Sequence, residues 1–156
     1  MLGTDGIVAF LFSMLPIFEL RGAIPWALRP GTTLSWQQAY AICVVGNMVP
    51  VPFLLMFLGA PCDFLRRNRH IDRFFEWLFE RTRKRSKVVE KYEALGLALF
   101  VAIPLPVTGA WTGSVAAFVF GIRFWYAILA ILCGVLIAGA IVTLATLGVV
   151  NLFFVQ

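Results

Sequence analysis

Two stretches of the chain are long and apolar enough to cross a lipid bilayer as single helices. Residues 36–58 and 124–150 contain no charged side chain. A transmembrane helix needs about 20 predominantly apolar residues to cross a hydrocarbon core of roughly 30 Å. Trp36 and Trp125 stand at the start of the two stretches, as is typical of residues at a membrane surface. We therefore predict one spanning helix in each stretch.

Two further apolar regions, residues 5–31 and 94–122, are interrupted near their middle. Pro16 breaks the first region and Pro104 breaks the second. At a rise of about 1.5 Å per residue, each half covers only about half of the hydrocarbon core. Non-helical backbone is tolerated at that depth where protein or trapped water satisfies its polar groups. Each region therefore predicts a re-entrant hairpin of two half-helices, and a kinked single span stays open for residues 94–122.

Local signals indicate where the second half-helix of each hairpin begins. Proline is favoured in the first turn of a helix, where its missing N–H costs nothing, so we expect Pro25 near the start of the second half-helix. In the other hairpin, the hydroxyl of Thr112 or Ser114 can cap the second half-helix. Both expectations place a helix N-terminus, with its positive dipole end, near a hairpin tip.

The segment between the two apolar halves is strongly basic. Ten of the thirteen lysine and arginine residues fall between Arg66 and Lys91, and the net charge of the chain is +5. Apolar residues recur among these charges near helical spacing, which predicts amphipathic helices over residues 62–93. A basic block beside apolar spans favours the cytoplasmic face and anionic lipid headgroups over nucleic acid.

The two apolar halves repeat the same order of elements. Residues 1–61 and 94–156 each contain a hairpin, an interface tryptophan and a full span. If each half crosses the membrane once, the halves lie in opposite orientations and the hairpin tips meet near the midplane, which is how secondary transporters build substrate sites. With 61% hydrophobic residues, we predict an all-α integral membrane protein of one domain. It has two inverted repeats, each a re-entrant helical hairpin followed by a transmembrane helix, joined by the cytoplasmic amphipathic segment.

An acidic and a basic side chain stand two residues apart within the first hairpin. An ionisable residue at membrane depth costs roughly 3 kcal/mol, so Glu19 and Arg21 predict a site rather than a surface turn. Asn47 lies in the first span close to Pro50, and both a proline-kinked span and a substrate path through Asn47 stay open. The candidate substrate-binding residues are Glu19, Arg21, Gly22, Pro25, Asn47, Thr108, Gly109, Trp111, Thr112 and Ser114.

The sequence contains no signature of soluble-type catalysis or metal binding. The three cysteines lack CxxC or Cys/His spacing, and the one histidine, His70, stands among arginines. No Ser/His/Asp, Cys/His or phosphate-loop motif occurs, and no nucleic-acid reader motif accompanies the basic block. We expect a non-enzymatic protein without cofactor or metal. Its candidate partners are membrane lipids, a lipid-phosphate or small amphipathic substrate and a second copy of the chain, with no nucleic acid.

Three motifs in combination resemble the signature of the small multi-drug export protein family. They are Phe18-Glu19-Leu20-Arg21-Gly22-Ala23-Ile24-Pro25, Gly46-Asn47-Met48-Val49-Pro50-Val51-Pro52 and Pro104-Leu105-Pro106-Val107-Thr108-Gly109-Ala110-Trp111-Thr112-Gly113. The resemblance covers nearly the whole chain. This family looks like a distant relative of the DedA/VTT superfamily, whose re-entrant hairpins carry an acidic residue and an arginine. Some DedA members translocate undecaprenyl phosphate or other phospholipids, with proton dependence proposed. Glu19 matches the acidic position and Arg21 lies close by, whereas residues 104–114 lack the arginine that DedA proteins place in the second hairpin.

The resemblance implies a multi-pass protein of a prokaryotic inner or plasma membrane that moves an amphipathic anion with proton linkage. In that interpretation Arg21 holds a phosphate and Glu19 is the proton-linked carboxylate, whose charge is disfavoured by desolvation when the site closes. Two alternatives stay open. An exporter of lipophilic cations would use Glu19 as the counter-charge, with Phe18, Trp26 and Trp111 as aromatic faces. A non-transporting membrane scaffold would use the Glu19–Arg21 pair as a structural ion pair.

Overall fold

The computed structural model describes residues 3–57, 87–104 and 108–154, and every regular element among them is an α-helix. Two helical stretches, Trp36–Phe57 and Phe124–Val149, are long and apolar enough to cross a membrane, at the positions predicted for the two spans. The all-α class is thus confirmed. The helices are α1 (Thr4–Met14), α2 (Glu19–Ala27), α3 (Trp36–Met48), α4 (Pro50–Phe57), α7 (Lys87–Ala102), α8 (Ala110–Val119) and α9 (Phe124–Phe154).

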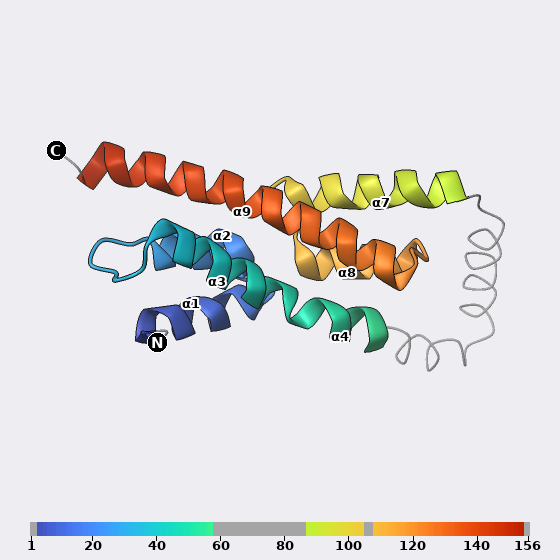
Figure 1. Ribbon diagram of the computed structural model, residues 1–156, viewed down its shortest axis with the longest axis horizontal. Helices are drawn as coiled ribbons and strands as arrows, with labels where there is room; N and C mark the ends of the chain where they lie inside the picture. Colours follow the sequence, from blue (N-terminus) through green and yellow to red (C-terminus); the bar gives the residue numbers. More distant parts are fainter. Residues whose placement is uncertain (1–2, 58–86, 105–107, 155–156) are drawn as a thin grey trace.

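Two helical hairpins point toward each other from opposite ends of the molecule (Figure 1). Helices α1 and α2 form one hairpin, α7 and α8 form the other, and both tips lie in the middle of the molecule. Helices α3 and α4 run along the molecule in one direction and α9 runs back in the other, so α1 begins and α9 ends at the same end. Segments that are far apart in the sequence therefore meet at the hairpin tips.

Local sequence signals explain where the first span begins and where it is interrupted. The Ser35 Oγ accepts a hydrogen bond from the Gln38 N–H at 3.3 Å, and the Gln38 Oε1 accepts one from the Ser35 N–H at 3.0 Å. This reciprocal pair is a capping box and fixes the start of α3. Helix α4 begins at Pro50, because proline has no N–H to continue the hydrogen-bond ladder of α3. The interruption lies close to Asn47.

The second half-helix of the first hairpin begins earlier than predicted. Helix α2 starts at Glu19, so Pro25 lies inside the helix and not in its first turn. The prediction was wrong because the turn closes sooner: the Glu19 N–H donates to the Leu15 carbonyl at 2.9 Å. Pro25 is tolerated because it removes only one hydrogen bond near the end of a helix that stops at Ala27.

Helix α8 also begins before the residues proposed to cap it. Its first residue is Ala110, and the Thr112 Oγ1 accepts a hydrogen bond from the Gly109 N–H at 3.0 Å. Thr112 therefore satisfies a backbone donor at the helix start, but from the third position of the helix, and the N-cap residue is Gly109 and not Thr112 as predicted. Ser114 does not cap α8, because its hydroxyl lies one turn further along and donates to the Ala110 carbonyl at 2.7 Å.

Small residues allow α9 to approach its neighbours closely. Ala130, Gly134 and Ala138 of α9 are all buried. A Cβ on Gly134 would lie 2.6 Å from the Val101 Cβ and 2.7 Å from the Ala98 carbonyl oxygen of α7. Close backbone approach through glycine and alanine is the usual way in which membrane helices pack, so this stripe fixes α9 against the second hairpin.

An ion pair closes the open end of the first hairpin. The Arg29 Nη2 donates to the Asp5 Oδ1 at 2.8 Å and the Arg29 Nη1 donates to the Trp26 carbonyl at 2.9 Å. The guanidinium also lies over the Trp26 ring, 3.8 Å from its centroid. The hydrogen bond from Arg29 holds the pKa of Asp5 below its ordinary value of 3.8. Because the pair joins the start of α1 to the residues after α2, it fixes the spacing of the two arms.

The segment predicted to be cytoplasmic, residues 62–93, lies mostly outside the described residues. Its last part belongs to α7, which begins at Lys87, earlier than the predicted hairpin boundary at residue 94. Helix α8 ends at Val119, within the predicted hairpin region, and α9 extends to Phe154.

Candidate functional site

The N-terminus of α2 presents Glu19 at the tip of the first hairpin. Glu19 has a φ of 44°, and among the described residues no other non-glycine residue has a positive φ. Such a conformation costs about 1–3 kcal/mol and persists only where the surrounding structure fixes it. Glu19 is also buried, with 8% of its surface exposed. A strained backbone therefore holds a buried carboxylate against the second hairpin.

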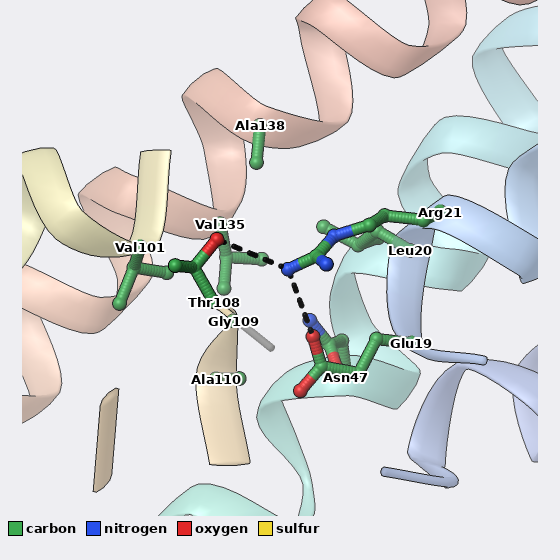
Figure 2. A pocket seen from close by; sticks show the side chains of 10 residues that line it. All are labelled: Glu19, Leu20, Arg21, Asn47, Val101, Thr108, Gly109, Ala110, Val135 and Ala138. Atoms are coloured by element: carbon green, nitrogen blue, oxygen red, sulfur yellow. Dashed lines mark hydrogen bonds and ion pairs between the residues drawn. The ribbon is translucent and has the colours of Figure 1, made fainter. Parts of the chain in front are cut away.

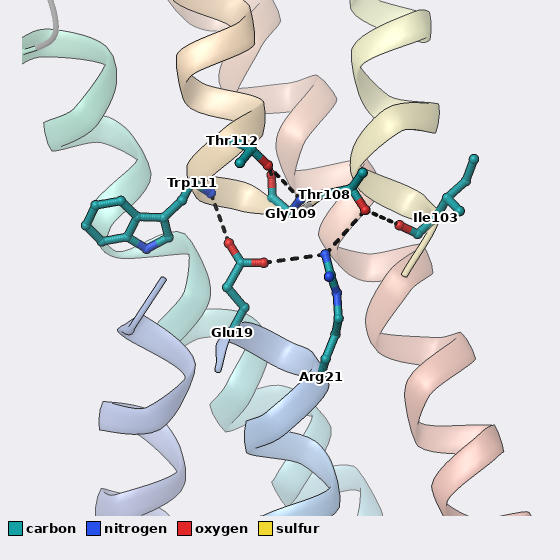
Figure 3. Close-up of polar contacts among 7 residues, drawn as sticks. All are labelled: Glu19, Arg21, Ile103, Thr108, Gly109, Trp111 and Thr112. Atoms are coloured by element: carbon teal, nitrogen blue, oxygen red, sulfur yellow. Dashed lines mark hydrogen bonds and ion pairs between the residues drawn. The ribbon is translucent and has the colours of Figure 1, made fainter. Parts of the chain in front are cut away.

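Groups from both hairpins hold the carboxylate of Glu19 (Figure 3). Its Oε1 accepts a hydrogen bond from the Trp111 backbone N–H at 3.2 Å. Its Oε2 lies 3.8 Å from the Arg21 Nη2. The Trp111 N–H is one of the first-turn donors of α8, which have no partner within their own helix and carry the positive end of the helix dipole. The carboxylate of one hairpin thus caps a helix of the other.

Arg21 also reaches the second hairpin. Its Nη2 donates to the Thr108 Oγ1 at 3.3 Å, and the Thr108 hydroxyl donates to the Ile103 carbonyl at 2.7 Å (Figure 3). Thr108 therefore links Arg21 to the end of α7. Within the described part of the chain, the Nε and Nη1 of Arg21 make no hydrogen bond, and the side chain is 27% exposed. Arg21 thus has donors that none of the described residues uses.

Trp111 and Gly109 complete the junction of the two tips. The Trp111 indole N–H donates to the Met14 carbonyl at 3.0 Å, which joins α8 to the end of α1. A Cβ on Gly109 would overlap the Glu19 carboxylate, so only glycine lets the two tips come this close without rearrangement. Three hydrogen bonds between the hairpins, from Trp111 to Glu19, from Trp111 to Met14 and from Arg21 to Thr108, therefore depend on the same close approach.

A small cavity of about 10 Å³, lined by both polar and apolar side chains, lies at this junction (Figure 2). This volume holds about one water-sized sphere. Asn47 of α3 forms part of the wall and is 1% exposed, and its Oδ1 has no hydrogen-bond partner within the described residues. A buried acceptor without a partner costs about 1–3 kcal/mol. The side-chain oxygen of Asn47 is thus a buried acceptor that none of the described residues satisfies.

The structure brings together seven of the ten candidate site residues. Five line the cavity, and two contact its wall through hydrogen bonds: the Trp111 N–H reaches Glu19 and Thr112 accepts from Gly109. The cavity-lining candidates are Glu19, Arg21, Asn47, Thr108 and Gly109.

The other three candidates lie outside the cavity wall. A Cβ on Gly22 would lie 2.9 Å from the Phe18 ring, so this glycine serves the packing of the turn. Pro25 is exposed on α2. Ser114 is fully buried and donates to its own helix. Gly22 and Ser114 thus have local contacts that account for them, whereas Pro25 is only exposed on its helix.

Five apolar wall residues are absent from the candidates chosen from the sequence. Leu20 stands between the two charged residues, and Ala138 belongs to the small-residue stripe of α9. Both positions could therefore have been included in the site from the sequence. No sequence feature identifies Val101 or Val135 as a site residue, because an apolar residue in an apolar helix does not reveal which neighbour it faces. The five residues are Leu20, Val101, Ala110, Val135 and Ala138.

The electrostatics of the junction favour negative charge. Helices α2 and α8 begin at Glu19 and Ala110, which both line the cavity, so two positive dipole ends lie beside it. These two residues replace Pro25 and Ser114 as the helix N-termini at the site. No group of three His, Cys, Asp or Glu side chains that could hold a metal ion occurs within the described ranges.

Two bilayer-length helices and a buried charged junction between hairpin tips are typical of an integral membrane protein of the transport class. The chain belongs to the small multi-drug export protein family, whose model matches residues 19–141. This match confirms the family resemblance and contains every residue that lines the cavity. No curated protein and no solved structure matches the chain.

Proposed function

We propose that the protein moves an amphipathic anion, such as a polyprenyl phosphate or another lipid phosphate, across the membrane without changing it chemically. The proposal rests on one difference between the two charged side chains, namely how many of their polar atoms already have a partner in the protein. Both carboxylate oxygens of Glu19 face a donor, whereas Arg21 has two nitrogens without a hydrogen-bond partner among the described residues. The planar guanidinium fork matches the geometry of a phosphate. An anion can therefore accept hydrogen bonds from the Arg21 nitrogens that have no partner. A cation would have to compete with Trp111 and Arg21 for the Glu19 carboxylate.

Helix lengths support a re-entrant, inverted-repeat topology as part of this proposal. Helices α1 and α2 contain 11 and 9 residues, or about 17 and 14 Å at the rise of an α-helix, against a core of roughly 30 Å. The first hairpin thus reaches about halfway from its own side. In the second hairpin, α8 has 10 residues and the apolar part of α7 is Tyr92–Ala102, so its apolar arms are also about half as long as the core. The two halves run in opposite directions (Figure 1). We place both termini outside and the basic segment in the cytoplasm.

The tightness of the junction supports a closed state of a transport cycle. A ligand pocket usually has a volume of about 300–1,000 Å³, and the cavity has about 10 Å³. Entry of a phosphate therefore requires the contacts of Glu19 with Trp111 and of Arg21 with Thr108 to open. An anion at Arg21 competes with Thr108, and a proton on Glu19 removes the charge that faces Arg21. Proton linkage would act by loosening these same contacts.

Export of lipophilic cations is the second candidate, because the family is described as multi-drug export. Two of its three candidate aromatic faces are occupied. The Phe18 ring stacks on Phe12 with centroids 5.0 Å apart, and the Arg29 guanidinium covers the Trp26 ring. Trp111 alone remains beside Glu19. The geometry therefore gives this candidate less support than the anion.

Reconstituted vesicles test the two candidates side by side, with a fluorescent lipid phosphate and a cationic dye as probes. Under our proposal, Arg21→Lys slows phosphate transport about tenfold or more, because the point charge of lysine loses at least one charge-assisted hydrogen bond of about 1.5 kcal/mol. Arg123→Lys, outside the site, serves as the matched control and should transport normally. Wild-type phosphate transport by Arg21→Ala would overturn the proposal, and transport of the dye alone would favour the cation candidate.

Cysteine labelling tests the topology. Single cysteines at Thr4 and Gln156, in a variant without Cys43, Cys62 and Cys133, are treated in intact cells with a reagent that does not cross the membrane. Both sites should react from outside. Labelling only after the membrane is opened would place the termini in the cytoplasm and overturn the re-entrant topology.

A further inference from the structure

A second, larger hollow lies beside the charged junction. It has a volume of about 450 Å³ and opens at the surface of the molecule. Helix α4 forms its floor with Pro50, Phe53, Leu54 and Phe57, and Met14 and Trp111 line it from the two hairpin tips. The volume is within the range of about 300–1,000 Å³ that is usual for ligand sites. We call this hollow the apolar groove.

The walls of the apolar groove are chemically uniform. Every lining side chain is apolar apart from the indole N–H of Trp111, and that N–H already donates to the Met14 carbonyl. Pro50 has no backbone N–H to offer. Because apolar cavities without polar partners stay dry and accept apolar molecules, the groove suits a hydrocarbon and not a polar ligand.

Trp111 connects the groove to the charged junction. Its backbone N–H holds the Glu19 carboxylate, while its ring lies in the wall of the groove, pointing away from Arg21 (Figure 3). Trp111 and the Glu19 carboxylate therefore lie between the apolar groove and Arg21, so the head of a ligand whose tail occupies the groove reaches Arg21 past Glu19. A ligand with a charged head and an apolar tail has the complementary arrangement.

We infer that the apolar groove binds the hydrocarbon tail of the transported amphipath while its anionic head occupies the Arg21 side of the junction. This inference rests on the proposed function and narrows the substrate class to anions that carry a long apolar chain. Phe53 and Phe57 are 59% and 64% exposed at the groove, on a helix that belongs to a membrane span. The surroundings of the groove are thus lipid hydrocarbon, from which a tail can enter sideways.

Fluorescence quenching by a bromine-carrying tail tests this inference. The probe is dodecyl phosphate with bromine on its terminal carbon, added to the protein in lipid nanodiscs. The reporter is a variant that keeps Trp111 as its one tryptophan, with phenylalanine at the other four positions. Leu54→Phe fills the groove, and Leu144→Phe makes the same substitution at a position on α9 that is 71% exposed and outside the groove.

We expect the probe to quench Trp111, Leu54→Phe to abolish the quenching, and Leu144→Phe to leave it unchanged. Equal quenching in the two variants would overturn the inference. If the reporter does not fold, a photoreactive alkyl phosphate is cross-linked to the native chain, and adducts should concentrate on residues 50–57. Adducts spread evenly over all lipid-facing helices would overturn the inference. A disulfide between two copies of a Leu54→Cys variant would also overturn it, because the groove would then face another copy of the chain.

An uncharged control separates this inference from the proposed function. Terminal bromododecane lacks the phosphate but has the same tail. If it quenches as strongly as the phosphate and Leu54→Phe abolishes the effect, the groove binds tails and the anion proposal fails. If neither compound quenches while Arg21→Lys still slows phosphate transport, the groove inference fails and the proposed function stands.

Discussion

A single added methyl group at Gly109 tests whether the two hairpin tips depend on their close approach. A Cβ at this position would overlap the Glu19 carboxylate, which must then move. The backbone at residue 109 is extended, with a φ of 172°, so alanine can adopt it. Gly109→Ala removes neither charge of the site. Its effect therefore reports on the contact between the tips.

The expected loss of stability follows from the contact that is broken. Moving the carboxylate removes its 3.2 Å hydrogen bond with the Trp111 N–H, and a hydrogen bond to a charged group contributes about 1.5–3 kcal/mol. Replacing glycine with alanine returns about 0.4–1 kcal/mol by restricting the unfolded chain. We expect Gly109→Ala to lose about 1–2 kcal/mol of stability. The closed state loses the same contact, so transport should fall about tenfold.

Gly96→Ala is the matched control. Gly96 lies in α7, and its Cβ would meet no atom within 4 Å apart from its chain neighbours and the backbone of its own helix. Alanine should therefore stabilise the helix by about 0.5–1 kcal/mol and leave transport unchanged. Thermal melting in detergent and transport in vesicles are measured for both variants. If Gly109→Ala melts as high as Gly96→Ala and transports normally, the tips do not need their close approach and the reasoning is refuted.

Three further predictions concern single side chains. Glu19→Gln keeps the shape but fixes a neutral group opposite Arg21, so phosphate binding should persist while transport loses its pH dependence; an unchanged pH profile would exclude Glu19 as the proton-linked group. Asn47→Leu removes an unsatisfied buried acceptor, so the melting temperature should rise, by the equivalent of about 1–3 kcal/mol, while transport is lost; a lower melting temperature would show that the carboxamide is satisfied. Because Arg29 lowers the pKa of Asp5 from 3.8, the pair stabilises the fold above that pH and loses its effect as pH falls through the lower folded value. Melting temperatures of wild type and Asp5→Asn should therefore converge in acid, and a constant difference would contradict the pairing.

The spanning helices could be predicted because hydropathy and length are properties of a local stretch. The charge-free runs starting at Trp36 and Phe124 are helical and bilayer-length in the structure. The start of α2 could not be predicted in the same way. Pro25 favours the first turn of a helix, but Glu19 takes a left-handed conformation and begins the helix earlier. That conformation is stabilised by a contact with Trp111, which is distant in the sequence.

Some of the residues that form the site could also be predicted from the sequence. The internal similarity of the two halves brought both broken regions into one hypothesis, so Glu19, Arg21 and Thr108 were candidates for one site before any contact was known. Which atoms meet was not predictable. The Arg21 Nη2 reaches a hydroxyl 87 residues away, and Val101 lines the same cavity without any polar atom to mark it.

The two ion pairs of the first hairpin differ in geometry, and the difference supports our proposal that the pair at the tip is a working site and not a structural ion pair. At the open end, Asp5 and Arg29 are 2.8 Å apart, the distance of a charge-assisted hydrogen bond. At the tip, Glu19 and Arg21 are 3.8 Å apart, and the same guanidinium nitrogen also donates to Thr108. An ion pair with a purely structural role should have a distance as short as that between Asp5 and Arg29. The charges of the tip pair are instead further apart, and the backbone of Glu19 has a conformation that costs about 1–3 kcal/mol. This geometry allows Glu19 and Arg21 to exchange their present partners for a substrate or a proton, as our proposal requires. A membrane scaffold would not need such an exchange.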